Sequence, residues 1–81
     1  MGSEEWLLRI YNDSFNTREY VSRCLVEVVR LDEQRAFYMM MHAHDFGIAA
    51  VGDYRQDVAE TYHEKLGKCG IRSDVVPSSE H

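Results

Sequence analysis

The chain has 81 residues, enough for one small domain but too few for two separate hydrophobic cores. Its 44% hydrophobic and 28% charged residues are typical of a folded globular protein and exclude a disordered one. The net charge of −5 disfavours nucleic-acid partners and suits binding of a cation such as a protonated amine, and no apolar run approaches the roughly 20 residues of a membrane span.

The first predicted element is a strand over residues 6–11. Trp6, Leu8 and Ile10 alternate with less apolar neighbours, which is the two-residue period of a strand. The polar run 12–14 follows directly, and short polar side chains favour turns over regular structure. We therefore expect a strand that ends in a polar loop.

A helix is predicted next. Asn16 has the side chain of an N-cap, and Glu19 stands three positions later, as in a capping box. The inner face of this helix has the i, i+3, i+4, i+7, i+8 spacing and comprises Val21, Cys24, Leu25, Val28 and Val29.

A second helix is predicted between Asp32, a suitable N-cap, and Gly47, a suitable C-terminal residue. The apolar run 48–51 then predicts a short buried strand, which we expect Gly52 and Asp53 to break.

A third helix is predicted over 55–67, with Val58, Tyr62 and Leu66 on its inner face. The last strand is expected over 71–76, before Pro77.

The order β-α-α-β-α-β predicts an α+β fold, a two-layer sandwich in which three helices cover one face of a small three-stranded sheet. We expect a disordered terminus at 1–5, one domain over 6–77 and a polar tail at 78–81. We expect no signal peptide before the predicted fold.

Metal and catalytic sites are not indicated. His42 and His44 are two residues apart, roughly 200° around a helix, and so cannot chelate one ion. Cys24 and Cys69 form no C-x-x-C motif, and we expect both to be reduced. There is no G-x-S-x-G motif and no glycine-rich phosphate loop, so we expect no enzyme and no cofactor.

One group of polar residues remains as a candidate binding site. Asn12 and Asp13 follow the first strand, and His44 lies late in the second helix. Met40, Ala43 and His44 share a helix face, and Val21 is a further apolar candidate. Spacing alone leaves two interpretations open: a polar-rimmed pocket, or a capped turn above ordinary core residues.

The run Tyr11-Asn12-Asp13-Ser14-Phe15-Asn16-Thr17-Arg18-Glu19-Tyr20-Val21 resembles the N-D-x-x-x-x-x-E-[FY]-V motif of ClpS adaptors. The resemblance continues through Ala36, Met40, Ala43-His44, Gly47, the run 57–61 and Gly70-Ile71. It spans about Trp6 to Pro77 and implies an antiparallel sheet.

Members of that family bind proteins whose first residue is Leu, Phe, Tyr or Trp and hand them to a Clp AAA+ unfoldase of the ClpA or ClpC type. The resemblance implies that Asn12 and His44 hydrogen-bond the α-amino group and first peptide unit, with Asp13 beside them. The other residues implied in the substrate site are Ser14, Asn16, the rim residue Arg18, and the pocket walls Val21, Met40, Ala43 and Ile71.

Several positions depart from the bacterial pattern. Ser14 replaces a second acid, Arg18 a gating methionine, and Ala43 a valine, which should widen the pocket. Tyr62 replaces a lysine that touches the unfoldase, so with Asp57 it marks only a weakly defined docking surface. This combination resembles plastid and cyanobacterial members.

The resemblance implies a monomer in the bacterial cytoplasm or the plastid stroma. Delivery in the family uses a flexible N-terminal extension, and because few residues precede Trp6, we expect substrate binding with poor delivery. The alternative is a scaffold or interaction domain of ribosomal-stalk-like fold without substrate binding.

Overall fold

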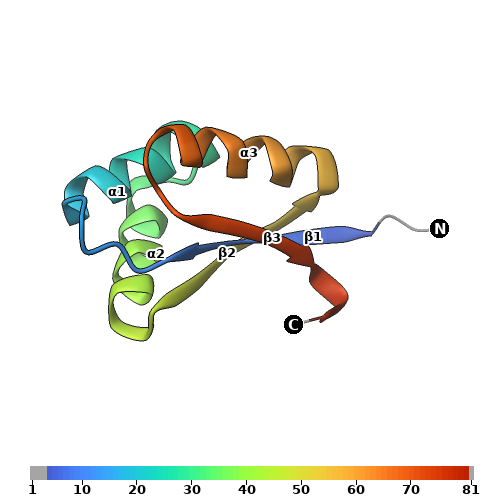
Figure 1. Cartoon of the computed structure of the whole chain (residues 1–81), viewed down its shortest axis with the longest axis horizontal. Helices are drawn as coiled ribbons and strands as arrows, with labels where there is room; N and C mark the ends of the chain where they lie inside the picture. The colour runs from blue at the N-terminus through green and yellow to red at the C-terminus, as the bar shows by residue number, and fades with distance from the viewer. Residues whose placement is uncertain (1–3, 81) are drawn as a thin grey trace.

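The computed structural model describes residues 4–80 (Figure 1). Along the chain lie β1 (Glu5–Tyr11), α1 (Arg18–Cys24), the π-helical stretch η1 (Leu25–Val29), α2 (Glu33–Phe46), β2 (Ile48–Arg55), α3 (Gln56–Lys68), β3 (Ser73–Pro77) and the short 3-10 helix η2 (Ser78–Glu80). The three strands form one antiparallel sheet in the order β2-β1-β3. The predicted α+β sandwich with the order β-α-α-β-α-β is confirmed.

Strand β2 is longer than expected. It continues through Gly52 and Asp53 to Arg55, so the predicted break at these two residues is wrong. The register shifts between Leu8 and Arg9, which pair with Gly52 and Ala50, and this leaves Val51 as the extra residue of a β-bulge. The bulge lies next to Gly52, so β2 bends at this glycine and does not end there.

The first helix begins one residue later than predicted. Thr17, not Asn16, is the N-cap, and its hydroxyl accepts a hydrogen bond from the Tyr20 N–H at 3.1 Å. Helix α1 passes directly into η1, a π-helical stretch that ends at Arg30 in a left-handed conformation (φ 71°). The helical run is therefore continuous from Arg18 to Val29, as its apolar spacing predicts.

Helix α2 has the predicted ends. The Asp32 carboxylate accepts a hydrogen bond from the Arg35 N–H at 2.7 Å, which is N-cap geometry. Gly47 adopts φ 90°, a left-handed conformation that a side chain disfavours, and its N–H donates to the Ala43 carbonyl at 2.8 Å.

The C-terminal elements are shifted from their predicted bounds. Strand β3 begins at Ser73, two residues later than expected, because the Ile71 N–H still donates to Leu66 O in the turn after α3. Pro77 lies inside β3. Within the expected terminal segments, Glu5 is the first residue of β1 and residues 78–80 form η2, whereas residues 1–3 and 81 lie outside the described part.

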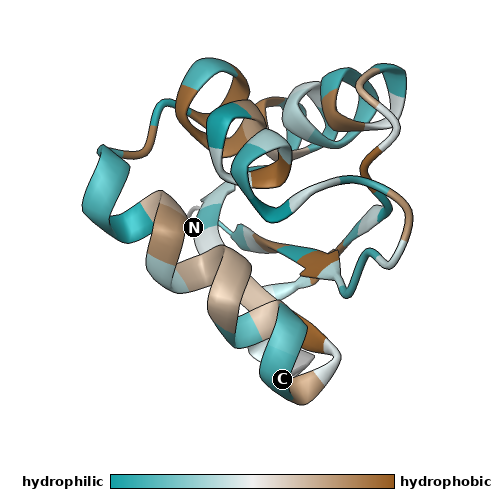
Figure 2. Cartoon of the chain, turned by 90° about the vertical axis from the view of Figure 1, so that its left-hand side faces the viewer, coloured by the Kyte–Doolittle hydropathy of each residue, from teal (hydrophilic) through white to brown (hydrophobic). Residues whose placement is uncertain are grey.

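The core lies between the sheet and the helices. Hydrophobic and hydrophilic segments alternate along each helix (Figure 2), which is the pattern of helices with one buried side. The cluster contains side chains of β1, β2, α1, η1, α2 and α3, and its largest fully buried side chains are Leu8, Ile10, Leu25, Val51 and Leu66. Burying one such side chain contributes about 1.5–3 kcal/mol.

A polar cluster ties β1 to β3. Arg9 donates two hydrogen bonds to the Asp74 carboxylate at 2.9 and 2.7 Å, and the Tyr11 hydroxyl donates to the same carboxylate. The Arg72 guanidinium lies 5.2 Å from the Tyr11 ring centroid. These contacts fix the end of β1, the point from which the Asn12–Asp13 loop starts.

Candidate functional site

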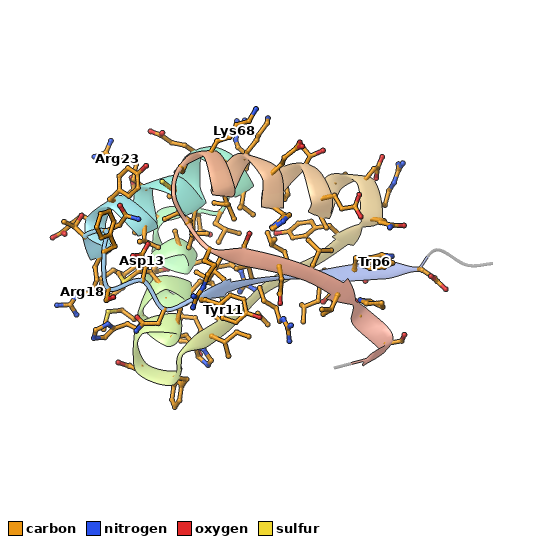
Figure 3. The ribbon with its side chains drawn as sticks, in the orientation of Figure 1. Trp6, Tyr11, Asp13, Arg18, Arg23 and Lys68 are labelled. Carbon is orange, nitrogen blue, oxygen red and sulfur yellow. The ribbon has the colours of Figure 1, made fainter. Side chains whose placement is uncertain are left out.

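Asp13 lies at the centre of the loop between β1 and α1. Its Oδ1 accepts hydrogen bonds from the N–H groups of Phe15 at 2.8 Å and Asn16 at 2.9 Å, and its Oδ2 accepts from Asn16 Nδ2 at 2.7 Å. In Figure 3, Asp13 and Arg18 lie at the end of the molecule opposite Trp6. The Asp13 carboxylate thus organises its own loop.

The ionisation of Asp13 reflects these contacts. Partial burial alone would raise the pKa of its carboxyl. The hydrogen bonds from Asn16 and Phe15 and the charge of Arg72 outweigh the burial, so the pKa lies below its usual value. The loop therefore holds a carboxylate that is ionised at neutral pH.

Asn16 extends the same network to the turn before β3. Its Nδ2 group donates to the Gly70 carbonyl at 3.2 Å as well as to Asp13. Gly70 has φ 86°, and a Cβ at this position would lie 3.7 Å from Asn16 Nδ2. Asn16 is thus a bridge between two loops and not a helix cap.

Asn12 is placed differently. Its backbone N–H donates to the Gly47 carbonyl at 2.9 Å, which holds the start of the loop against the C-terminal end of α2. Its side chain is exposed and makes no hydrogen bond within residues 4–80. The amide therefore keeps an acceptor and two donors available to a ligand.

His44 lies in the last turn of the same helix end. Its side chain is exposed, and among the described residues it has no hydrogen-bond, ion-pair or ring partner. By contrast, His42 Nδ1 lies 3.1 Å from the Ile48 carbonyl, and its ring packs against Tyr38 and Phe46. The structure thus brings Asn12 to the helix end that carries His44, and neither side chain has a partner in the part of the chain that the structure describes.

The predicted pocket walls are core residues. Val21, Met40, Ala43 and Ile71 are only 2–6% exposed and belong to one hydrophobic cluster. A ligand side chain can reach these four residues only if neighbouring side chains move. Met40 is the most adaptable of the four because its unbranched side chain has three rotatable bonds.

A hollow with a volume of about 740 Å³ lies beside this cluster, between α1–η1 and α2. Of the predicted site residues it is lined by Arg18 and Met40. Its other apolar lining residues are Val26, Phe37 and Met41. Arg18 crosses between the two helices, with its Nη1 at 3.9 Å from Met41 Sδ. We call this hollow the α1–α2 groove.

Two loop-fixing residues were not predicted. Thr17 caps α1, and the preference of threonine for the N-cap position was the signal available in the sequence. The Tyr20 hydroxyl donates to the Cys69 carbonyl at 2.7 Å, a contact across 49 residues that no local pattern encodes.

The remaining candidates lie elsewhere. Ser14 is exposed in the loop. Asp57 is exposed in the first turn of α3 and pairs with Arg55 at 3.1 Å, and Tyr62 packs edge-on against Tyr54 at 5.1 Å between ring centroids. Within residues 4–80 no three His, Cys, Asp or Glu side chains are grouped to hold a metal ion, and no helix is long and apolar enough to cross a membrane.

Comparisons with known proteins identify relatives of this chain. Residues 2–73 match the family model described as the ATP-dependent Clp protease adaptor protein ClpS. Among solved structures, Agrobacterium tumefaciens ClpS2 bound to L-phenylalaninamide is similar with a TM-score of 0.86 and 30% identity, over 95% of this chain and 100% of that one.

Curated Clp protease adapter proteins are also similar. The relative from Myxococcus xanthus is 42% identical over 66 residues, or 82% of this chain and 62% of the relative. The chloroplastic relative from Chlamydomonas reinhardtii is 39% identical over 84% of this chain and 43% of its own length. The relative from Prochlorococcus marinus is 36% identical over 90% of this chain and 70% of its own length. This chain thus spans less than two thirds of the first two relatives. The family match nevertheless covers most of the chain, and the protein belongs to the ClpS family of Clp protease adaptors.

Proposed function

We propose that this protein binds the free α-amino group and the bulky hydrophobic first residue (Phe, Tyr, Trp or Leu) of substrate proteins and delivers them to a ClpA- or ClpC-type AAA+ unfoldase. The observation that carries the proposal is the pair of exposed side chains of Asn12 and His44 at the C-terminal end of α2, neither of which has a partner within residues 4–80. The similar ClpS2 structure holds L-phenylalaninamide, which presents a free amine and an aromatic side chain.

The chemistry of Asn12 and His44 fits such a ligand. A free α-amino group has a pKa of about 7.7–8.0, so it is mostly a cation at pH 7 and needs hydrogen-bond acceptors. The Asn12 carbonyl oxygen and a neutral His44 ring nitrogen are acceptors, and the C-terminal end of α2 favours positive charge. Acetylation of the amine removes its charge and leaves acceptors unpaired, at about 1–3 kcal/mol each.

The first side chain supplies the remaining binding energy. Burial of a bulky apolar side chain against the cluster of Val21, Met40, Ala43 and Ile71 contributes about 1.5–3 kcal/mol. A β-branched first residue clashes near its own backbone in a narrow entry, which disfavours valine and isoleucine. The small Ala43 leaves more room and favours aromatic first residues, while Arg18 lies at the rim.

Asp57 and Tyr62 on α3 are the proposed docking residues for the unfoldase. Asp57 is exposed, and Tyr62 is half-buried, so both are within reach of a second protein. A monomer in the bacterial cytoplasm or the plastid stroma fits relatives from Myxococcus xanthus, from cyanobacteria and from a chloroplast.

Fluorescence anisotropy with labelled peptides that differ only at their first residue tests the proposal. Peptides that begin with phenylalanine, leucine, valine and N-acetylphenylalanine are titrated with the protein. The proposal predicts micromolar or tighter binding of the free phenylalanine peptide and loss of at least tenfold in affinity on acetylation. If no peptide binds, the domain is better explained as an interaction scaffold that does not recognise N-termini.

A further inference from the structure

The α1–α2 groove lies beside the proposed first-residue pocket but is not lined by Val21, Ala43 or Ile71, three of that pocket's proposed walls. Phe37, Met41 and His44 follow one another on one face of α2 at helical spacing. Phe37 and Met41 line the groove, and the exposed His44 lies three residues beyond Met41, outside the groove lining. Arg18 and Met40 line the groove and are also residues of the proposed site.

The groove has the length of a short peptide segment. On α1–η1 its lining residues run from Arg18 to Glu27, a distance of nine residue steps, which is about 13–14 Å at roughly 1.5 Å per residue. An extended chain advances about 3.3–3.6 Å per residue, so roughly three to four residues fill this length. A peptide anchored by its amine at His44 can therefore lie along the groove with the residues that follow its first one.

The lining indicates which side chains would fit. Phe37 is 56% exposed although it is large and apolar, and it stands beside Met40 and Met41, whose flexible thioethers adapt to different shapes. Charged residues also line the groove: Glu19, Glu27, Glu33, Arg18 and Arg23. An apolar surface bordered by charges of both signs can bind the apolar side chain of a peptide whose backbone stays in contact with water.

We propose that the α1–α2 groove is a second subsite of the same binding site, which receives a bulky apolar side chain at the third or fourth residue of the substrate. This inference rests on the proposed function, because the groove is filled only by a chain whose amine is held by Asn12 and His44. The Arg18 side chain lines this groove and contacts Met41.

Competition binding tests the inference. Unlabelled peptides displace a labelled phenylalanine peptide, which keeps fluorophores out of the groove. The competitors are Phe-Gly-Gly-Gly and its variants with leucine at the third or at the fourth position. Burial of part of one leucine side chain predicts about three- to tenfold tighter binding of at least one leucine variant.

Two matched variants of helix α2 locate the effect. Phe37→Ala removes the exposed ring in the groove, and Phe46→Ala removes an even more exposed ring, 71% against 56%, that does not line it. Phe37→Ala should abolish the leucine advantage and leave the affinity for Phe-Gly-Gly-Gly unchanged. Phe46→Ala should preserve both.

The outcomes separate the two proposals. Equal affinity for the three peptides overturns the second subsite while the first-residue site stands. If the leucine peptides still bind more tightly to Phe37→Ala, the leucine side chain contacts another surface, and this result also overturns the inference. If none of the free phenylalanine peptides binds, the proposed function fails and the second subsite fails with it.

Discussion

Asn12 and Asp13 are neighbours in sequence but lie in opposite environments. The Asp13 carboxylate accepts three hydrogen bonds from its own loop, whereas the Asn12 side chain has no partner in the described part of the chain. His44 likewise has no partner among the described residues. His42, two residues earlier on the helix, resembles Asp13 because its ring nitrogen contacts the Ile48 carbonyl. The comparison separates residues that build the site from residues that are available to a ligand.

The largest effect on stability is expected at Asp13. Asp13→Ala leaves two backbone N–H groups and the Asn16 amide without their acceptor, and it should lower the free energy of unfolding by about 2–4 kcal/mol. Denaturant unfolding measures this change. Ser14→Ala, an exposed neighbour, is the control and should cost less than about 0.5 kcal/mol. Equal stability of the two variants would remove the structural role of Asp13.

Asn12→Ala should have the opposite profile. The affinity for a free phenylalanine peptide should fall by about 1–3 kcal/mol, since the ammonium group loses an acceptor. The free energy of unfolding should change by less than about 0.5 kcal/mol because only the side chain is removed and the N–H···O bond to Gly47 stays. Anisotropy and thermal unfolding on the same sample measure both. A large drop in melting temperature would make Asn12 a structural residue like Asp13.

The fold was more predictable than the site. Element order and the caps of α2 followed from apolar periodicity, Asp32 and Gly47, all of which act over a few residues. The β-bulge and the Tyr20–Cys69 contact depend on distant partners, so local spacing could not predict them. The sequence pointed to Asn12, Asp13 and His44 together, but only the structure shows that the Asp13 carboxylate accepts three hydrogen bonds from its own loop.

The Arg9–Asp74 pair links β1 to β3 just before the loop that carries Asn12 and Asp13. Asp74→Asn removes a two-point charged contact to Arg9, so the free energy of unfolding should fall by about 1 kcal/mol. Asp57→Asn, which breaks the far more exposed pair with Arg55, is the matched control and should have almost no effect. Urea unfolding of both variants measures the difference. Similar losses would show that the β1–β3 cluster does not anchor the loop.

Acid should weaken the structural carboxylates. The pKa of Asp74 is lowered by its hydrogen bond from Arg9, and that of Asp13 is lowered despite partial burial. A lowered folded-state pKa stabilises the protein above the unfolded value of about 3.9, and this stabilisation is lost as the pH falls through the folded value. Unfolding free energies measured from pH 6 to pH 2.5 should fall below about pH 4. Asp13→Ala should flatten that dependence, and an unchanged slope would contradict the assignment.

The two cysteines give the smallest effect. Burial raises the pKa of the Cys24 thiol to about 11, with Cys69 adding to the rise and Tyr20 opposing it. Cys24 should therefore stay protonated and react slowly with alkylating reagents at pH 8, whereas the more exposed Cys69 should react first. Mass spectrometry of Cys24→Ser and Cys69→Ser after timed alkylation identifies the reactive thiol. Faster reaction of Cys24 would show that α1 opens readily at this point.

The most direct test compares His44→Ala with His42→Ala in binding to free and N-acetylated phenylalanine peptides. These residues lie two positions apart on α2, but only His42 has a partner within the described residues. We predict that His44→Ala binds the free peptide at least tenfold more weakly and that His42→Ala shows no matching loss. Acetylation of the peptide should also reduce its affinity much less for His44→Ala than for the unmodified protein. Unchanged affinity in His44→Ala, or an equal loss in His42→Ala, would contradict the proposed role of His44.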